Sequence, residues 1–321
     1  MRWMQILNRQ QMSKIDFTDT QVLLQIFWKT LQSKRNGRAV NAQEIAMIPE
    51  MLTKGAFYSL PGYLLDDQLV GLKWTSHVPK TNEPFTEPLI LLNSMQSGMP
   101  LALVDGLRIG GVRTALVTLL ALQKLLSVVP IRILICGSGF QAQQHLDVLY
   151  HSLPNTHFLI WDREQSHAQR VAAQYTRRVS VVNDLKYACQ SSTRVIIGAT
   201  SAMEPYLHYE WLSPRQLYVH IGLHDMAPDD VAHFNKIICD DYRAGQLTSQ
   251  QSLFIAMRQG LIVSKQVQLL EDISVPLDTS SDNKPLMFDQ FGLQIFDFVL
   301  AKYALTKFER KFENANISIS N

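Results

Sequence analysis

A short apolar run near the middle of the chain is followed by small residues whose spacing could hold a phosphate. The run covers residues 133–136, and Gly137, Gly139 and Ala142 follow it. The first glycine permits a tight turn, the second lets the backbone approach a pyrophosphate, and the small third residue lets a helix pack closely on the strand. Because the first N–H groups of that helix lack partners and its dipole is positive at this end, the turn favours phosphate groups. The pattern predicts a dinucleotide site; the plainer alternative is a strand–helix turn in which glycine serves packing.

The helix start and the next predicted strand complete this candidate cofactor site. Phe140 and Gln141 open the helix. The run of residues 157–164 predicts a second strand, and Asp162 stands at the end of that strand. The acid follows the glycines by roughly 20 residues, which suits a carboxylate that binds ribose hydroxyls. Its charge would repel a 2′-phosphate, so the sequence favours NAD. The neighbouring Arg163 could accept that phosphate, which leaves NADP open.

Composition and charge narrow the class of protein. The chain has 321 residues, of which 46% are hydrophobic and 18% charged, as is typical of a soluble globular protein with about two domains. A formal net charge of +2 is too small to favour nucleic acid or a membrane surface as a partner. No apolar run reaches the roughly 20 residues that span a bilayer, and the N-terminus lacks the apolar core of a signal peptide, so we expect a cytoplasmic protein. No group of His, Cys, Asp or Glu has a metal-ligand spacing, and we expect no metal.

The elements that would position these residues change in character along the chain. Residues 1–112 mix helix and strand, and their strands follow one another through short turns, which favours an antiparallel sheet. From about residue 130 to 245, strands alternate with helices, which favours a parallel sheet covered by helices. The apolar stretch 114–126 predicts a buried helix, and the pattern over 292–308 predicts a final helix. The predicted strands cover residues 57–60, 69–74, 88–92, 101–104, 133–136, 157–164, 194–198, 217–221 and 236–239.

Several short motifs, in the same order along nearly the whole chain, resemble those of the ornithine cyclodeaminase and mu-crystallin family. That family shows an Arg-Thr pair that opens a helix just before a GxGxQA turn, a GxK strand, a loop after the fourth strand and a recognisable start of the last helix. The matching segments of this chain are, in that order, Arg113-Thr114 with residues 137–142, residues 71–74, Thr200-Ser201 with Glu204-Pro205, and residues 288–292 followed by Asp297.

The resemblance implies a fold and its division into domains. It implies an α/β protein with a Rossmann-type, doubly wound parallel sheet, beside a smaller α+β domain that binds substrate and whose sheet forms a homodimer. We therefore assign residues 114–291 to the dinucleotide-binding domain. Residues 1–113 form the expected substrate-binding and dimerisation domain, with residues 292–321 packing back on it.

The resemblance also implies chemistry. Members of the family move a hydride between a nicotinamide and the α-carbon of an amino or imino acid, so NAD is the expected cofactor and a small amino or imino acid the expected partner. Arg113 and Lys73 would hold the substrate carboxylate, because guanidinium binds carboxylate bidentately and a lysine in an apolar strand needs an anionic partner. The simpler alternatives are an arginine in a surface ion pair and a strand-edge lysine whose stem reaches outward.

Asp225 is the candidate proton donor and acceptor. It follows the predicted strand 217–221, and ligands bind beyond the carboxyl ends of parallel strands. The matching aspartate in cyclodeaminases is the proposed acid and base, whereas the simpler alternative is a helix N-cap. The resemblance therefore gives a catalytic set of Asp225, Lys73 and Arg113. It also adds to the cofactor site Thr114 and, on the nicotinamide side, Thr200 and Ser201.

Three positions depart from the family pattern. The family carries a second carboxylate-binding arginine near residues 40–45, where this chain has Glu44. A carboxylate there would repel a carboxylate and attract an ammonium, so Glu44 joins the candidate substrate-binding residues. The threonine three residues before the Arg-Thr pair is Gly110 here, and a serine near the last helix is Gln290. These changes bear on the substrate more than on the cofactor.

Three functions stay open at this point. The leading one is an ornithine cyclodeaminase-like reaction that converts ornithine to proline and ammonia and regenerates the cofactor. The second is net redox chemistry: reduction of a ketimine, or dehydrogenation of an N-substituted amino acid of the opine or metallophore-precursor kind. The third is a non-catalytic dinucleotide-binding protein of the mu-crystallin kind. A stoichiometric change in NADH absorbance is expected only for the second.

Overall fold

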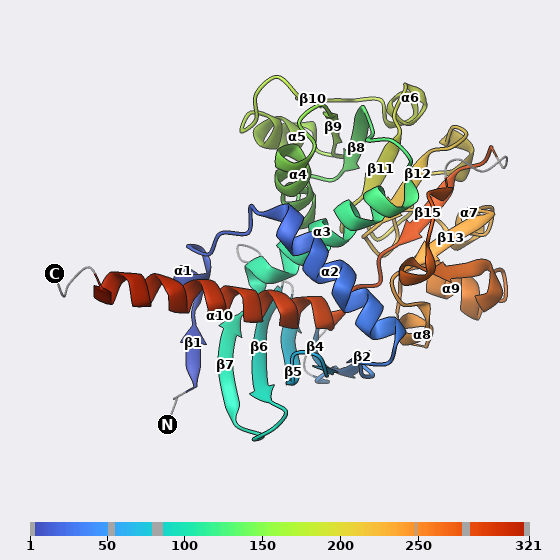
Figure 1. The fold of residues 1–321 in the computed structure, drawn as a ribbon. Coiled ribbons are helices and arrows are strands. Elements are labelled where there is room, and N and C mark those ends of the chain that lie inside the picture. The colour runs from blue at the N-terminus through green and yellow to red at the C-terminus, as the bar shows by residue number, and fades with distance from the viewer. Residues whose placement is uncertain (1–3, 51–54, 79–85, 248, 278–282, 318–321) are drawn as a thin grey trace. The chain divides into compact units, whose positions relative to one another are not determined.

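The structure is a computed structural model that describes residues 4–50, 55–78, 86–247, 249–277 and 283–317 (Figure 1). The chain divides into two compact units. Unit 1 contains Met1–Arg113 together with Leu293–Asn321, and unit 2 contains Thr114–Gly292. No helix in the described ranges is long and apolar enough to cross a membrane.

Unit 1 is built on a sheet of seven strands. The strand order is β1-β7-β6-β5-β4-β2, and β3 pairs with β4. The strands from β2 to β7 pair antiparallel, as predicted, whereas β1 runs parallel to β7. The bounds are β1 Gln5–Leu7, β2 Ala39–Asn41, β3 Ile45–Met47, β4 Ala56–Leu64, β5 Leu69–His77, β6 Thr86–Ser94 and β7 Pro100–Asp105, with the short helix α1 at Arg9–Met12.

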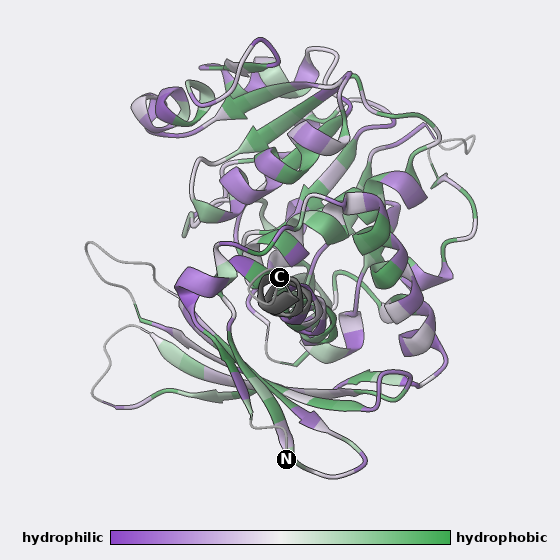
Figure 2. Ribbon diagram, turned by 60° about the vertical axis from the view of Figure 1, so that its left-hand side comes forward, coloured by the Kyte–Doolittle hydropathy of each residue, from purple (hydrophilic) through white to green (hydrophobic). Residues whose placement is uncertain are grey.

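Two helices cover the concave face of this sheet. Helix α10 (Gln294–Ile317) contacts β2, β4, β5 and β6, and helix α2 (Thr20–Arg35) packs beside it (Figure 2). An added Cβ at Gly71 would lie only 2.8 Å from the ring of Phe298. Glycine on β5 therefore lets α10 approach the sheet closely, which positions the polar residues on α10 against those on β5.

Helix α3 (Leu107–Leu125) starts earlier than the sequence predicts. The predicted helix begins at Thr114, where the apolar stretch starts, and the preceding Gly110 and Gly111 disfavour helix. In the structure Ile109 is fully buried and Val112 is nearly so. Burial of these apolar side chains outweighs the cost of the two glycines, and Arg113 consequently lies inside the helix and does not open it.

Unit 2 is a doubly wound sheet of eight strands, all parallel. Its order is β10-β9-β8-β11-β12-β15-β13-β14. The order reverses between β8 and β11, which is the switch point at which such sheets bind nucleotides, and the predicted Rossmann-type fold is confirmed. The strand bounds are β8 Arg132–Cys136, β9 His157–Trp161, β10 Val179–Val181, β11 Val195–Gly198, β12 Leu217–His220, β13 Lys236–Cys239, β14 Val267–Leu269 and β15 Leu286–Asp289.

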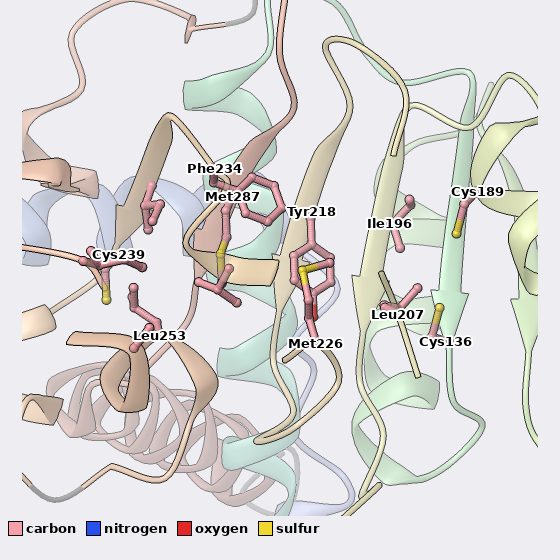
Figure 3. Packing of buried hydrophobic residues seen from close by; sticks show 14 of the residues in the cluster. Cys136, Cys189, Ile196, Leu207, Tyr218, Met226, Phe234, Cys239, Leu253 and Met287 are labelled. Carbon is pink, nitrogen blue, oxygen red and sulfur yellow. The ribbon is translucent and has the colours of Figure 1, made fainter. Parts of the chain in front are cut away.

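A hydrophobic cluster lies against one face of this parallel sheet. Ile196 and Tyr218 on neighbouring strands are fully buried, and Met226 and Leu253 from the segments beyond the strands are buried against the same cluster (Figure 3). The helices of unit 2 are α4 Phe140–Ser152, α5 Gln165–Ala172, α6 Leu185–Gln190, α7 Pro228–Val231, α8 Tyr242–Gly245 and α9 Ser252–Arg258, with short 3-10 turns at Tyr209–Trp211, Ser264–Gln266 and Leu270–Asp272.

Candidate functional site

The glycine turn after β8 has the backbone that a phosphate-binding turn needs. Gly137 has φ +107°, and a Cβ there would lie 2.6 Å from the carbonyl oxygen of Ala199, so both conformation and space require glycine. Gly139 differs, because a Cβ built there would meet no heavy atom within 4 Å among the described residues. The backbone at Gly139 is therefore open to a ligand.

Helix α4 begins at this turn with its first N–H groups uncapped by a side chain. Gly139 is the N-cap residue and makes no side-chain cap bond. The first N–H groups of a helix have no acceptor within it, so they are available to phosphate oxygens. Phe140 is 46% exposed at this end, Ala142 is buried, and the buried Oε1 of Gln141 accepts no hydrogen bond from the described residues.

Asp162 lies where the sequence predicts a ribose-binding carboxylate. It follows β9 directly, beside the glycine turn that follows β8. Ser138 of the turn donates its hydroxyl to Asp162 Oδ2 at 2.5 Å, and the backbone N–H of Glu164 donates to Oδ1 at 2.9 Å. These bonds fix the carboxylate at the edge of the turn while leaving acceptor capacity on both oxygens. The open Gly139, the uncapped helix start and this carboxylate together fit a dinucleotide.

Unit 1 contains a buried cluster of charged side chains. Lys73 is 8% exposed, and its Nζ lies 2.9 Å from Oδ1 of the fully buried Asp297. Arg113 Nε lies 3.6 Å from Asp297 Oδ2, and within the described residues neither of these two atoms has a hydrogen-bond partner. Lys73 comes from β5, Arg113 from α3 and Asp297 from the first turn of α10. The alternatives of a surface arginine and an outward-reaching lysine are wrong.

The charge states within this cluster depend on one another. Burial lowers the pKa of Lys73, and the neighbouring charge of Arg113 lowers it further, whereas the charges of Asp297 and Glu44 raise it. Two cations share one partner carboxylate in Asp297. The trio of Lys73, Arg113 and Asp297 therefore carries a net positive charge when Lys73 is protonated, which suits the carboxylate of a ligand.

Glu44 lies in the same row of the sheet as Lys73. It immediately precedes β3, whose first residue Ile45 pairs with Ser59, so Glu44 falls opposite Leu60. Leu60 in turn pairs with Lys73 on β5. One strand thus lies between Glu44 and Lys73, and the distance between their backbones across the sheet is about 10 Å. Residues opposite each other in a row share a face of the sheet, and in agreement the charges of Glu44 and Lys73 each shift the pKa of the other.

The environment of Glu44 is partly desolvated. Burial raises the pKa of the Glu44 carboxyl, and the positive charge of Lys73 opposes this rise. Burial and the charge of Glu44 both raise the pKa of Tyr58 on the neighbouring strand β4. No hydrogen bond or ion pair joins Glu44 to another of the described residues. Its carboxylate is consequently the one member of this group whose charge lacks a direct partner in the described chain.

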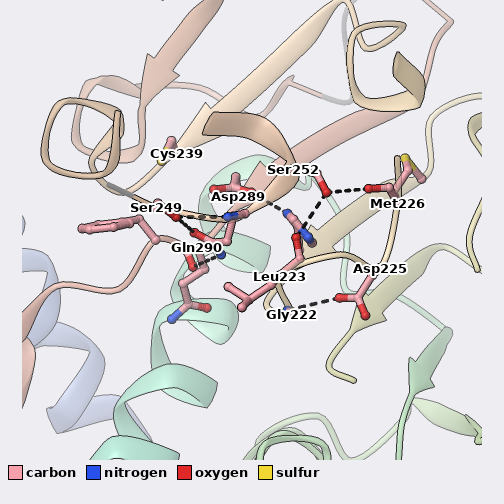
Figure 4. A network of polar contacts seen from close by, with 12 residues as sticks. Gly222, Leu223, Asp225, Met226, Cys239, Ser249, Ser252, Asp289 and Gln290 are labelled. Carbon is pink, nitrogen blue, oxygen red and sulfur yellow. Dashed lines mark hydrogen bonds and ion pairs between the residues drawn. The ribbon is translucent and has the colours of Figure 1, made fainter. Parts of the chain in front are cut away.

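Asp225 lies inside unit 2, with a relative exposure of 1%. Its carboxylate accepts hydrogen bonds from Thr200 Oγ1 at 2.5 Å and Tyr206 Oη at 2.9 Å. It also accepts one from the backbone N–H of Gly222 at 3.1 Å (Figure 4). The alternative role as a helix N-cap is wrong, because α7 is capped by Ala227. Its predicted role in proton transfer stays a prediction.

The remaining predicted residues differ in exposure. Ser201 is exposed next to Thr200. Thr114 is buried, and its carbonyl oxygen accepts a hydrogen bond from Gln290 Nε2 at 3.1 Å. Gln290, which departs from the family pattern, also accepts from the hydroxyl of Thr118 at 3.2 Å. This glutamine therefore ties the end of β15 to α3 within unit 2.

The sequence did not predict the buried contacts of Asp297, of Tyr206 or of the pair formed by His220 and Asp289. Asp297 was recognised only as part of a motif, although an ammonium in an apolar strand calls for a counter-charge. The partner could not be identified, since it lies 224 residues from Lys73. Tyr206 and His220 carried no signal in the sequence, and Asp289, the buried partner of His220, was recognised only as part of the motif at residues 288–292. His220 Nδ1 lies 2.6 Å from Asp289 Oδ1, and both side chains are fully buried.

Comparison with known proteins places these features in a family. The model of the "Ornithine cyclodeaminase/mu-crystallin family" matches residues 8–311. An NAD(P)H-dependent anabolic L-arginine dehydrogenase, DauB of Pseudomonas aeruginosa, is 26% identical over 274 residues, which cover 81% of this chain and 84% of the relative. The ketimine reductase mu-crystallin of Rattus norvegicus is 26% identical over 272 residues, covering 80% and 82%.

Solved structures share the same fold. The Δ1-pyrroline-2-carboxylate reductase of Thermococcus litoralis, solved in complex with NADH and L-proline, has a TM-score of 0.85 at 22% identity and covers 97% of this chain and 98% of its own. An archaeal alanine dehydrogenase dimer with bound NAD has a TM-score of 0.83 at 20% identity, covering 96% and 97%. The match of the family model over residues 8–311 shows that the chain belongs to the ornithine cyclodeaminase/mu-crystallin family.

Proposed function

We propose that this protein uses NAD(H) to act on the C–N bond of an α-amino or α-imino acid, with conversion of ornithine to proline and ammonia as the leading reaction. The observation that carries the proposal is the buried cluster of Lys73, Arg113 and Asp297 with Glu44 in the same row of the sheet. Membership of the family and relatives named as reductases and dehydrogenases of such acids support it.

The glycine turn and Asp162 would hold the dinucleotide. Gly139 and the N–H groups at the start of α4 would bind the pyrophosphate, and Asp162 would accept bonds from the adenosine ribose. The carboxylate favours NAD over NADP because it would repel a 2′-phosphate. When bound, the nicotinamide would supply hydride acceptance and donation at the substrate α-carbon. Thr200 and Ser201 follow β11, on the nicotinamide half of such a sheet.

Lys73 and Arg113 would hold the substrate carboxylate. Each cation already contacts Asp297, so each is oriented before the ligand arrives and needs no further ordering. Arg113 Nε and two N–H groups of Lys73 would be free to face a carboxylate. When Lys73 is protonated, the trio carries a net positive charge, which one bound carboxylate neutralises.

Glu44 favours a substrate that carries a second positive charge. The backbone of Glu44 lies about 10 Å across the sheet from that of Lys73. A substrate side chain of several methylenes would therefore reach from the carboxylate site to Glu44. Its partly desolvated carboxylate has no partner in the described chain. An ammonium such as that of ornithine would satisfy it, whereas a plain apolar acid would not.

The direct test is to incubate the protein with NAD and ornithine. Ammonia and proline should appear in equal amounts, with no lasting change in NADH absorbance. Norvaline is the matched control, because it has the same carbon chain without the terminal amine, and it should give no cyclisation. Loss of NADH on addition of a cyclic ketimine, with ornithine untouched, would instead favour the reductase alternative.

Two variants test the substrate-binding roles. Arg113→Lys keeps the charge but loses the bidentate fork, and hydrogen bonds to charged groups contribute about 1.5–3 kcal/mol each, so kcat/KM should fall roughly ten- to hundredfold. Glu44→Gln should raise the KM for ornithine while leaving NADH affinity unchanged. NADH binding without turnover of any amino or imino acid would favour the non-catalytic alternative.

We also propose that unit 1 forms a homodimer through the outer face of its sheet. This face is apolar across strands: Leu72 pairs with Leu91, and Leu91 pairs with Leu103. Around these leucines, Ile6, Val70, Trp74 and Leu89 are 58%, 43%, 36% and 43% exposed. An apolar sheet face of this kind usually marks a protein contact.

The oligomeric state can be tested by one charge on this face. Leu72→Asp should convert a dimer to a monomer in sedimentation velocity, because a charge would be desolvated in the interface. Leu65→Asp is the control, since Leu65 is 36% exposed in the turn after β4 and outside that face. A wild-type protein that sediments as a monomer would contradict the proposal.

A further inference from the structure

Asp225 joins two segments at the carboxyl edge of the parallel sheet. One segment follows β11 and runs from Ala199 to Tyr206, and the other follows β12 and runs from Ile221 to Met226. In a doubly wound sheet the strands beyond the switch point hold the second mononucleotide of a dinucleotide, which is the nicotinamide half. What fixes these two segments therefore shapes the surface on which that half would bind.

The side chain of Asp225 bonds to both segments. Thr200 and Tyr206, both from the first segment, donate to Oδ1. The N–H of Gly222 in the second segment donates to Oδ2 (Figure 4). The backbone carbonyl of Asp225 extends the connection, accepting from the N–H groups of Tyr206 at 3.2 Å and Leu207 at 2.9 Å. One residue thereby holds five groups in place.

The sheet leaves space for this carboxylate by using glycine. An added Cβ at Gly198, the last residue of β11, would lie 2.7 Å from Asp225 Oδ2, and a Cβ at Gly222 would collide with the same oxygen. The ring of Tyr206 also stacks on Trp161 at the end of β9, with 5.2 Å between ring centroids. The carboxylate is thus packed into the interior of unit 2 and does not face outward.

We propose that Asp225 is a positioning residue, which sets the shape of the nicotinamide-binding segments, and that it is not the group that exchanges protons with substrate. All three donors to its carboxylate are neutral hydroxyl or amide groups of unit 2, and they occupy both carboxylate oxygens inside that unit. This inference rests on the proposed dinucleotide site.

The two roles predict opposite results for Asp225→Asn. An aspartate that only transfers protons can be replaced without loss of NADH affinity. A positioning aspartate cannot, because the amide places an N–H against the donor of Gly222, or against the hydroxyls. We expect the Kd for NADH to rise at least about tenfold, since hydrogen bonds to a charged acceptor are lost. The Kd for ADP-ribose should stay within about twofold, because this ligand lacks the nicotinamide that the two segments would bind. A general loss of fold would instead weaken the binding of both ligands alike.

Binding of NADH and of ADP-ribose is measured by calorimetry on the full chain, with melting temperature as a check of folding. Tyr206→Phe removes a single donor and keeps the ring stacked on Trp161, so it should raise the Kd for NADH by a smaller factor. This variant keeps the inference testable if Asp225→Asn does not fold. Asp229→Asn, an exposed acid on the same stretch, is the matched control and should change neither Kd.

Each result decides the matter. Unchanged NADH affinity in Asp225→Asn would overturn the inference and restore the proton-transfer role. Equal weakening of NADH and ADP-ribose would also overturn it, because the effect would then be general. If the wild-type protein bound neither ligand, the proposed function itself would fail, and the inference with it.

Discussion

Two buried aspartates, one in each unit, are stabilised in opposite ways. Asp297 in unit 1 is fully buried against two cations, Lys73 and Arg113. Asp225 in unit 2 is as deeply buried, yet its partners are two hydroxyls and a backbone N–H. The first arrangement leaves an excess of positive charge that a ligand carboxylate can neutralise. The second gives the carboxylate three neutral donors, which fits the positioning role that we propose for it.

A third buried acid lies between these two cases. Asp289 contacts His220, whose imidazole can give up its charge near neutral pH, unlike a guanidinium. Burial lowers the pKa of His220, but the hydrogen bond and the charge of Asp289 raise it more, so the pKa lies above the usual 6.5. The comparison therefore predicts a graded series of effects when each partner is removed.

The largest effect on stability is expected for Asp297→Asn. The change leaves Lys73 and Arg113 buried without a counter-charge, and breaking a buried ion pair in this way costs about 3–5 kcal/mol of unfolding free energy. Urea denaturation measures it. The double variant Asp297→Asn with Lys73→Met should recover much of the loss, because it removes one of the unpaired cations. A loss below about 1 kcal/mol in the single variant would show that water reaches the cluster.

Removal of His220 should have a smaller effect that depends on pH. Because the folded-state pKa of His220 is above 6.5, its protonated form contributes stability that is fully present below pH 6.5 and lost as pH rises through the folded pKa. The stability difference between the wild-type protein and His220→Asn should therefore shrink as pH rises. Thermal unfolding between roughly pH 5 and 8 measures this. A difference that grows with pH would contradict the ion pair with Asp289.

Loss of a neutral donor to Asp225 should cost less again. Tyr206→Phe deletes the hydroxyl at 2.9 Å and keeps the ring, so unfolding free energy should fall by about 1–2 kcal/mol, since the donor is neutral but the acceptor is charged. Urea denaturation of this variant and of Asp297→Asn under the same conditions compares the free energy lost with a neutral partner and with ionic partners. If Tyr206→Phe were the more damaging of the two variants, the distinction between the aspartates would be lost.

The smallest effect is expected at an exposed pair. Lys302 Nζ lies 2.6 Å from Asp67 Oδ1 with side-chain exposures of 49% and 31%. Water and salt screen such a pair, so Asp67→Asn should cost no more than about 1 kcal/mol. Stability of this variant at low and high salt is the measurement. A cost comparable with that of Asp297→Asn would mean that burial is not what separates the two sites.

The elements that the sequence predicts correctly are those with strong local patterns. The glycine turn, the alternation of strands and helices in unit 2 and the antiparallel strands of unit 1 all lie where the pattern indicates. The start of α3 is wrong, because burial of Ile109 and Val112 overrides the local preference of two glycines. The place of β15 between β12 and β13 could not be predicted, since strand order depends on packing between distant segments.

Residue types and spacing by themselves determined the dinucleotide turn and the presence of Asp162 beside it, because a strand, a turn and a helix start are made by neighbours in the chain. They also identified Lys73 as a cation that needs an anion, whereas the family resemblance added Arg113. Only the tertiary structure decided which anion that is, and that Asp225 points inward to three neutral donors. The physical reason is that a buried charge is stabilised by whatever lies within a few ångströms, and for Lys73 that group is 224 residues away along the chain.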